Sequence, residues 1–193
     1  MEASSHQAIT KKRSVWPLMP ICLPIICLAV YYTPFLVSLG WHLTHGMAAN
    51  YRGLRIPVPF GWTVDTGSSE DFPANPQGII LEKQSETLHL ESRGPETMFF
   101  NRLLPDAQST PTQQAANWEN LFLQSHSSSD YDMSRRNDLS ADIDCLQATP
   151  VDARSATALA CISSKNGWVA IYAGTPANVP VFLRVANTVK AKP

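Results

Sequence analysis

Asp65 is the residue whose surroundings best suit acid–base chemistry, because it opens the segment Asp65-Thr66-Gly67-Ser68-Ser69. Cleavage of a peptide bond by aspartates needs two carboxyl groups that share one proton, since two carboxyl groups about 3 Å apart cannot both ionise. The chain holds no second segment of this kind, so the second carboxylate would have to come from another copy. Asp, Thr, Gly and Ser also build ordinary turns, which is the simpler interpretation.

The same segment resembles the active-site loop of pepsin-like aspartic proteases. One loop per chain implies the homodimeric, retropepsin-like version of that enzyme, with Asp65 as the catalytic residue. That version also carries an apolar-apolar-glycine segment behind the loop, for which Gly78-Ile79-Ile80 and Tyr172-Ala173-Gly174 are only partial matches. We therefore keep the protease as the alternative function and assign no catalytic residue in the favoured one.

Two histidines, His42 and His45, are spaced to lie one turn apart on a helix. Zinc needs a third or fourth protein ligand, and beyond these two only His89 and His126 follow. An acidic run supplies oxygen ligands but lacks the spacing of a calcium loop; its members are Asp130, Asp132, Asp138, Asp142 and Asp144. We predict no metal site and no cofactor.

The cysteines form two pairs with different meanings. Cys22 and Cys27 lie in an apolar run, where cysteine packs as a small apolar residue. Cys145 and Cys161 lie eight residues on either side of Ala153 in a predicted hairpin, so they should face each other across two antiparallel strands. In an oxidising compartment such a pair forms a disulfide, which we predict here.

An uncharged run from Val15 to Gly40 is long enough to cross a membrane as a helix. It exceeds the short apolar core of a secretory signal peptide, which favours an uncleaved anchor. Lys11, Lys12 and Arg13 precede the run and predict a cytoplasmic N-terminus. We therefore expect a single-pass protein of the cell (inner) membrane, with the lipid bilayer as the partner of residues 15–40.

This topology divides the chain into four parts. They are a cytoplasmic tail over 1–14, a transmembrane anchor over 15–40, a juxtamembrane linker over 41–53 and an extracytoplasmic domain over 54–193.

The domain alternates between patterns of strands and helices. Extended segments are predicted at Leu54–Val64, Ile79–Lys83, Thr87–Ser92, Thr97–Leu104, Ile143–Thr149, Ala156–Ser163 and Trp168–Gly174. Thr110 and Gln113 predict a capping box, with Pro111 at the first position, for a helix that ends near Ser125. Asn178 is the predicted cap of a second helix. The predicted fold is α+β: an N-terminal transmembrane helix followed by an antiparallel sheet whose face is covered by two helices.

Two segments of this domain carry a family resemblance. Ile56-Pro-Val-Pro-Phe-Gly-Trp62 is similar to the opening strand of the PsbP/LpqN-like family of small α/β sandwich domains. Trp168-Val-Ala-Ile-Tyr-Ala-Gly174, leading into Phe182–Val189, is similar to its closing strand and helix. The resemblance implies an extracytoplasmic domain of a family whose members are mostly non-enzymatic assembly factors or binding modules.

The favoured function is therefore a membrane-anchored extracytoplasmic binding or envelope-assembly accessory domain without catalytic activity. The formal net charge of −1 gives no reason to expect nucleic acid as a partner, and we predict a protein partner of unknown identity.

Overall fold

The computed structural model describes residues 19–65, 78–83, 96–106, 108–137, 139–152 and 155–191. Residues 1–33 and 34–193 form two compact units. The first helix, α1 (Met19–His45), begins in the first unit and ends in the second.

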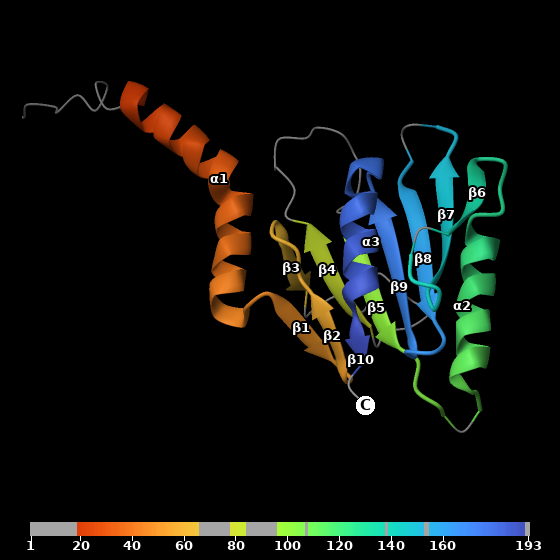
Figure 1. The fold of residues 1–193 in the computed structure, drawn as a ribbon. Coiled ribbons are helices and arrows are strands. Elements are labelled where there is room, and N and C mark those ends of the chain that lie inside the picture. Colours follow the sequence, from red (N-terminus) through yellow and green to blue (C-terminus); the bar gives the residue numbers. More distant parts are fainter. Residues whose placement is uncertain are drawn as a thin grey trace, which may run out of the picture. The chain divides into compact units, whose positions relative to one another are not determined.

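Seven antiparallel strands make the main sheet of the second unit, in the order β3-β4-β5-β9-β8-β7-β6 (Figure 1). The strands are β3 (Trp62–Asp65), β4 (Ile79–Lys83), β5 (Thr97–Arg102), β6 (Tyr131–Arg136), β7 (Asp144–Pro150), β8 (Thr157–Ser163) and β9 (Trp168–Gly174). Between β5 and β6 the helix α2 (Pro111–Ser125) takes the chain from the middle of the sheet to its far edge. From there β6 to β9 return strand by strand to pair with β5.

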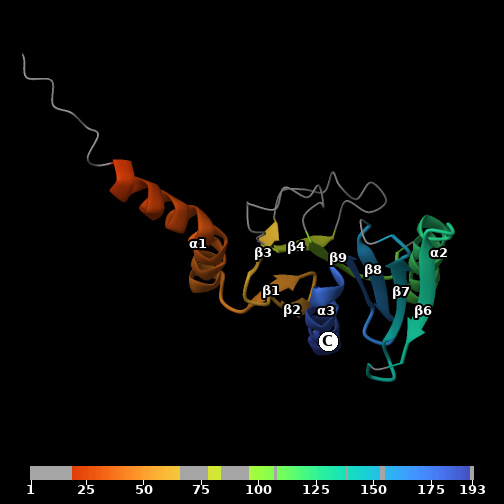
Figure 2. The ribbon, with the colours of Figure 1, turned by 90° about the horizontal axis from the view of Figure 1, so that it is seen from above.

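A second sheet has three short strands in the order β1-β2-β10. Strands β1 (Ala48–Tyr51) and β2 (Leu54–Pro57) form a hairpin, and β10 (Lys190–Ala191) pairs with β2 from the other end of the chain. Immediately before β10 come a 3-10 turn, η2 (Pro176–Asn178), and the helix α3 (Val179–Thr188). Viewed from above, α3 lies beside β1 and β2 (Figure 2).

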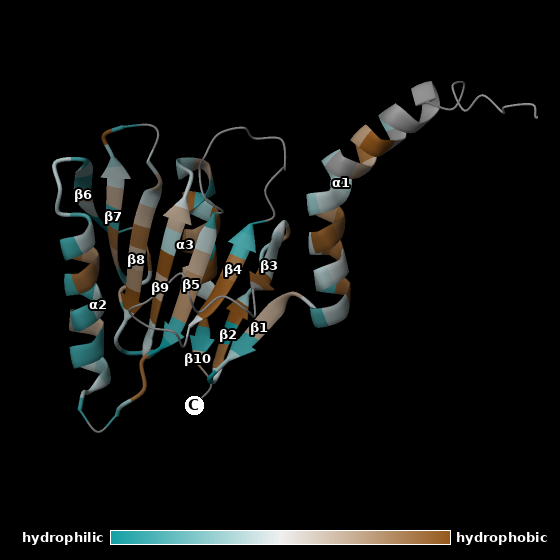
Figure 3. Ribbon diagram, turned by 180° about the vertical axis from the view of Figure 1, so that it is seen from behind, coloured by the Kyte–Doolittle hydropathy of each residue, from teal (hydrophilic) through white to brown (hydrophobic). Residues whose placement is uncertain are grey.

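Opposite faces of the main sheet pack against different partners. On one face, α3 and the small sheet bury the larger part of the core, which includes Trp62, Phe100, Trp168, Tyr172 and Phe182. The other face packs on α2 through two smaller clusters, centred on Phe122 and on Leu103. The central strands are accordingly mostly apolar, whereas much of α2 is hydrophilic (Figure 3).

The start of α2 follows the predicted capping box. The Thr110 side chain accepts a hydrogen bond from the Gln113 backbone N–H, and the Gln113 side chain accepts one from the Thr110 N–H. Pro111 occupies the first turn, where a missing donor costs nothing. The helix ends at Ser125, as the sequence predicted.

The predicted transmembrane helix is wrong. In the part of the chain that the structure describes, no helix is both long enough and apolar enough to cross a membrane. The last turns of α1 instead belong to the folded unit. Ser38, inside the predicted span, is buried and donates to the Trp62 carbonyl, and His42 is buried beside it.

The β2–β3 turn receives this end of α1. The Gly61 backbone N–H donates to the Ser38 hydroxyl at 2.9 Å, and Gly61 has φ = 87°, a conformation that favours glycine. Both ring nitrogens of His42 lie near backbone carbonyl oxygens, that of Gly46 at 3.0 Å and that of Pro59 at 3.2 Å. The helix α1 therefore continues to His45, beyond the predicted end at residue 40, and these contacts hold its last turns against the domain.

The sheet arrangement also differs from the prediction. Two sheets form instead of one, and the helices α2 and α3 pack on opposite faces instead of the same face. Residues 41–53, for which we expect a linker, contain the end of α1 and all of β1. The strand expected at 87–92 lies outside the described residues.

Candidate functional site

The predicted disulfide is confirmed. Cys145 in β7 and Cys161 in β8 are directly opposed, with their Cα atoms 4.1 Å apart, and they form a disulfide. Both residues are fully buried on the face of the sheet that packs against α3. Because the register is centred on Ala153, the symmetry of the hairpin was sufficient to identify the pair.

Asp65 is the last residue of β3 and lies opposite Ile80 in the register of β3 and β4. The four residues that follow it in the proposed protease segment, 66–69, lie outside the described residues. The catalytic role of Asp65 stays a prediction.

The two helical histidines, His42 and His45, do not converge on a shared site. His42 is occupied by backbone carbonyls and stacks on Phe60, while the exposed His45 stacks on Trp41. His126 lies at the end of α2 and contacts the Phe122 carbonyl. Across the described ranges, no group of three or more His, Cys, Asp or Glu side chains could hold a metal ion.

The described residues of the acidic run lie in or beside strands β6 and β7. Asp142 accepts a hydrogen bond from the Asn166 side chain, and hydrogen bonds from Ser140 and its own backbone hold the pKa of this carboxyl below its usual value. Asp144 pairs with Arg135, and Asp138 lies outside the described residues. Asp142 and Asp144 are therefore engaged in contacts within the domain.

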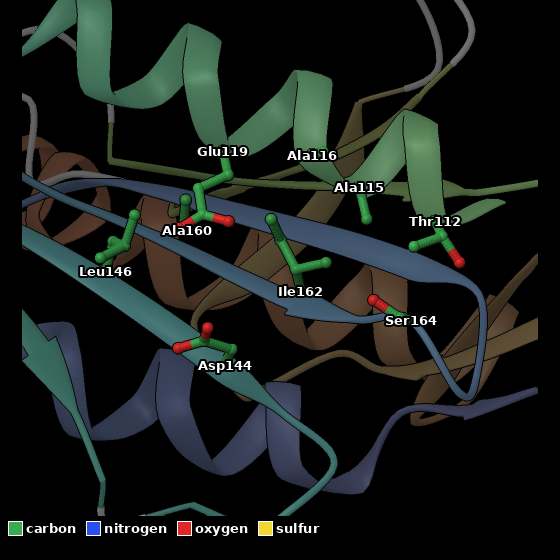
Figure 4. Close-up of a pocket in the computed structure, with 9 residues that line it drawn as sticks. All are labelled: Thr112, Ala115, Ala116, Glu119, Asp144, Leu146, Ala160, Ile162 and Ser164. Atoms are coloured by element: carbon green, nitrogen blue, oxygen red, sulfur yellow. The ribbon is translucent and has the colours of Figure 1, made fainter. Parts of the chain in front are cut away.

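A small cavity of about 190 Å³ lies between α2 and strands β7 and β8 (Figure 4). Glu119 extends into it from α2, and Asp144 lies at its β7 side. Both carboxylates bind Arg135 of β6, at 2.8 Å in the case of Glu119. The arginine thus offsets one of the two negative charges and links α2 to the sheet edge. The volume is below the range of about 300–1,000 Å³ typical of small-molecule sites.

A polar network surrounds Glu96 where β5 begins. Glu96 accepts hydrogen bonds from the Thr175 backbone and from the side chains of Thr175 and Asn178, and it pairs with Lys83 at 3.3 Å. The Tyr172 hydroxyl donates to the Thr175 carbonyl, and burial raises the pKa of that phenol far above its usual value. All these groups fix the turn between β9 and α3, so we assign the network a structural role.

A larger groove of about 500 Å³ lies where β5 leads into α2. Its walls come from the β1–β2 turn (Arg52), the end of β5 (Asn101, Arg102) and α2 (Asn117, Trp118). Asn101 is buried, yet its Oδ1 atom has no hydrogen-bond partner, and the same is true of the buried Nε of Arg102. No pattern in the sequence marked this site, because its walls are far apart along the chain.

Apolar side chains of α1 are exposed on successive turns. In the first unit Ile26, Leu28, Tyr31 and Tyr32 are 51–57% exposed. In the second unit, four more apolar residues of α1 are exposed: Phe35, Leu36, Val37 and Leu43. Met47, which follows α1, is also exposed, and so is Phe60, whose ring contacts that of Phe35. Exposed apolar surface of this kind marks an interaction site with another molecule or with lipid.

No protein-family model matches the chain, and no curated protein matches it.

Proposed function

We propose that the chain is a non-catalytic binding domain that works at a lipid surface in an oxidising compartment. The observation that carries this proposal is the row of exposed apolar side chains on α1. Fully burying one large apolar side chain stabilises by about 1.5–3 kcal/mol, so covering these half-exposed residues favours association by roughly 1 kcal/mol each.

The charges near α1 favour lipid as the molecule that covers its exposed apolar side chains. Between Met19 and Tyr51 the chain has no Asp, Glu, Lys or Arg, and Lys11, Lys12 and Arg13 stand just before the helix. A cluster of basic residues next to an apolar segment is attracted to anionic lipids by about 1 kcal/mol per charge. The proposal requires contact with lipid and does not require α1 to cross the bilayer.

The compartment follows from the disulfide. Structural disulfides persist outside the reducing cytosol, and Cys145–Cys161 is fully buried in the larger core. The resemblance of residues 56–62 and 168–189 to PsbP/LpqN-like domains supports the same proposal, because members of that family are mostly extracytoplasmic and non-enzymatic. A binding role also agrees with the groove beside α2, whose described walls carry amides, guanidinium groups and an indole.

Flotation with lipid vesicles tests the proposal. The full chain, exchanged out of detergent, should float with vesicles of phosphatidylcholine and phosphatidylglycerol, and less with phosphatidylcholine alone. Leu28→Asp combined with Leu36→Asp should abolish flotation, because each inserts a charge into apolar surroundings. Val151→Asp is the matched control, since Val151 is 66% exposed in the β7–β8 turn.

If the unmodified chain stays with the unbound protein, or if the double variant floats equally well, the proposal is wrong. The alternative of a homodimeric aspartic protease predicts a different result. It requires a peptidase activity of the full chain that is inhibited by pepstatin and lost in Asp65→Asn. We expect no such activity, and finding it would overturn the non-catalytic assignment.

A further inference from the structure

We infer that the groove between the end of β5 and α2 is a saccharide-binding site. This inference deepens the proposed binding function and rests on it only in that a binding domain needs a ligand site. The volume of the groove, about 500 Å³, lies within the range of small-molecule sites and would hold a disaccharide.

A residue of the groove wall contains a buried acceptor without a donor. Asn101 is 5% exposed, and within the described part of the chain its Oδ1 has no donor. Leaving a buried polar atom unpaired costs about 1–3 kcal/mol. Because this oxygen has almost no accessible surface, a ligand hydroxyl can donate to it only when the Asn101 side chain turns toward the groove that the residue lines. The next residue, Arg102, leaves the complementary group unpaired, since its buried Nε is a donor.

One stripe of α2 side chains faces the groove. Gln114, Asn117, Trp118 and Leu121 occur at helical spacing and all line it. Ala115 and Phe122 are the buried residues of α2, whereas Trp118 is half-buried and contacts both the sheet and the groove.

The chemistry of this stripe fits a sugar ring. The Gln114 amide nitrogen already donates to Leu104, Asp106 and Ser109, whereas the exposed Asn117 amide offers both donors and an acceptor to ligand hydroxyl groups. The Trp118 indole, whose centre lies 5.7 Å from that of the Phe99 ring, provides a fixed apolar surface for the ring C–H groups. Leu104 and Leu121 extend that surface and are 44% and 47% exposed.

A peptide fits the groove less well. Extended peptides bind by adding a strand to a free sheet edge, and β5 is hydrogen-bonded to β4 on one side and β9 on the other. The charged residues of the lining are Arg52, Arg102 and Asp106. Their sum of +1 suits a neutral sugar or one with a single carboxylate.

Calorimetric titration of the full chain tests the site, with diacetylchitobiose and digalacturonate as probes and trialanine as the peptide comparison. The protein should be kept in a phosphocholine detergent, because maltoside headgroups would compete for the groove. We expect saturable binding of at least one disaccharide. Asn117→Ala should weaken it at least fivefold, because Asn117 is exposed on the groove stripe. Asn120→Ala, exposed on the same helix outside the groove, should leave it unchanged.

Each other outcome overturns the inference. If neither disaccharide binds, or if only trialanine binds, the groove is not a saccharide site. Equal weakening by Asn117→Ala and Asn120→Ala would place the binding elsewhere on the chain. Because no groove residue belongs to α1, vesicle flotation succeeds or fails separately from this titration.

Discussion

Removing the Cys145–Cys161 disulfide tests how the core of the main sheet is held together. The relevant change is the double substitution Cys145→Ala and Cys161→Ala, which removes the crosslink and both sulfur atoms. Both residues are 0% exposed, so alanine introduces no buried polar group, whereas serine would.

The size of the effect follows from the loop that the disulfide closes. The cysteines are separated by 16 positions, for which the chain-entropy relation assigns about 3 kcal/mol to the crosslink. Loss of the sulfur atoms from a closely packed region adds roughly 1 kcal/mol. We therefore expect a loss of about 3–5 kcal/mol, a large share of the total of about 5–15 kcal/mol typical of folded domains. The melting temperature should fall by about 2–4 °C for each kcal/mol lost.

Urea unfolding followed by near-ultraviolet circular dichroism measures this loss, with all proteins in the same detergent. Cys27→Ala, at an exposed and unpaired cysteine, is the control and should leave the midpoint unchanged. Unmodified protein treated with a reductant keeps both sulfur atoms, so its unfolding free energy should fall only by the contribution of the crosslink, about 3 kcal/mol. The reasoning is refuted if the unfolding free energy of the double variant lies within about 1 kcal/mol of that of the unmodified protein and its slope against urea concentration is the same.

Three further predictions concern single side chains. Thr110→Ala removes the N-cap of α2 and should cost about 1 kcal/mol of unfolding free energy, whereas Thr112→Ala, exposed within the first turn, should cost much less. His42→Ala should cost about 1–3 kcal/mol of unfolding free energy in urea, because it removes the ring that contacts the Gly46 and Pro59 carbonyl oxygens and leaves at least one of them without its donor, and the exposed His45→Ala should have little effect. The raised pKa of Tyr172 means that the folded chain holds this proton more tightly than the unfolded chain, so its contribution to stability is present below about pH 10 and is lost as the pH rises further. Tyr172→Phe should therefore make the alkaline fall in unfolding free energy shallower, and an unchanged slope would contradict this assignment.

Local patterns in the sequence were sufficient for the elements that depend on nearby residues. The bounds of α2 follow from Thr110 and Gln113, because a capping box involves only residues within one turn. The partnership of Cys145 and Cys161 follows from the symmetry of one hairpin, in which the turn sets the register. Strands β8 and β9 were recognisable as continuous apolar runs because both of their faces are buried.

Other elements could not be read from local patterns. Strand β2 lies within the predicted extended segment Leu54–Val64, but β1 and β10 have only four and two residues, and β10 exists because the end of the chain returns to β2. Strand β6 is largely exposed and polar, so it lacks the alternation that marks a strand. Its pairing with β7 at the sheet edge gives it that structure.

The sequence by itself determined the composition of the apolar N-terminal run, the capped helix α2, the β7–β8 hairpin and its disulfide. The tertiary structure decided where α1 joins the domain, since Ser38 and His42 find their partners in the β2–β3 turn. It also decided that α2 and α3 cover opposite faces, and that Asn101 and Trp118 share a groove. The physical reason is the range of the interactions: caps and hairpins involve neighbours in sequence, whereas docking and groove formation join segments that only the folded sheet brings together.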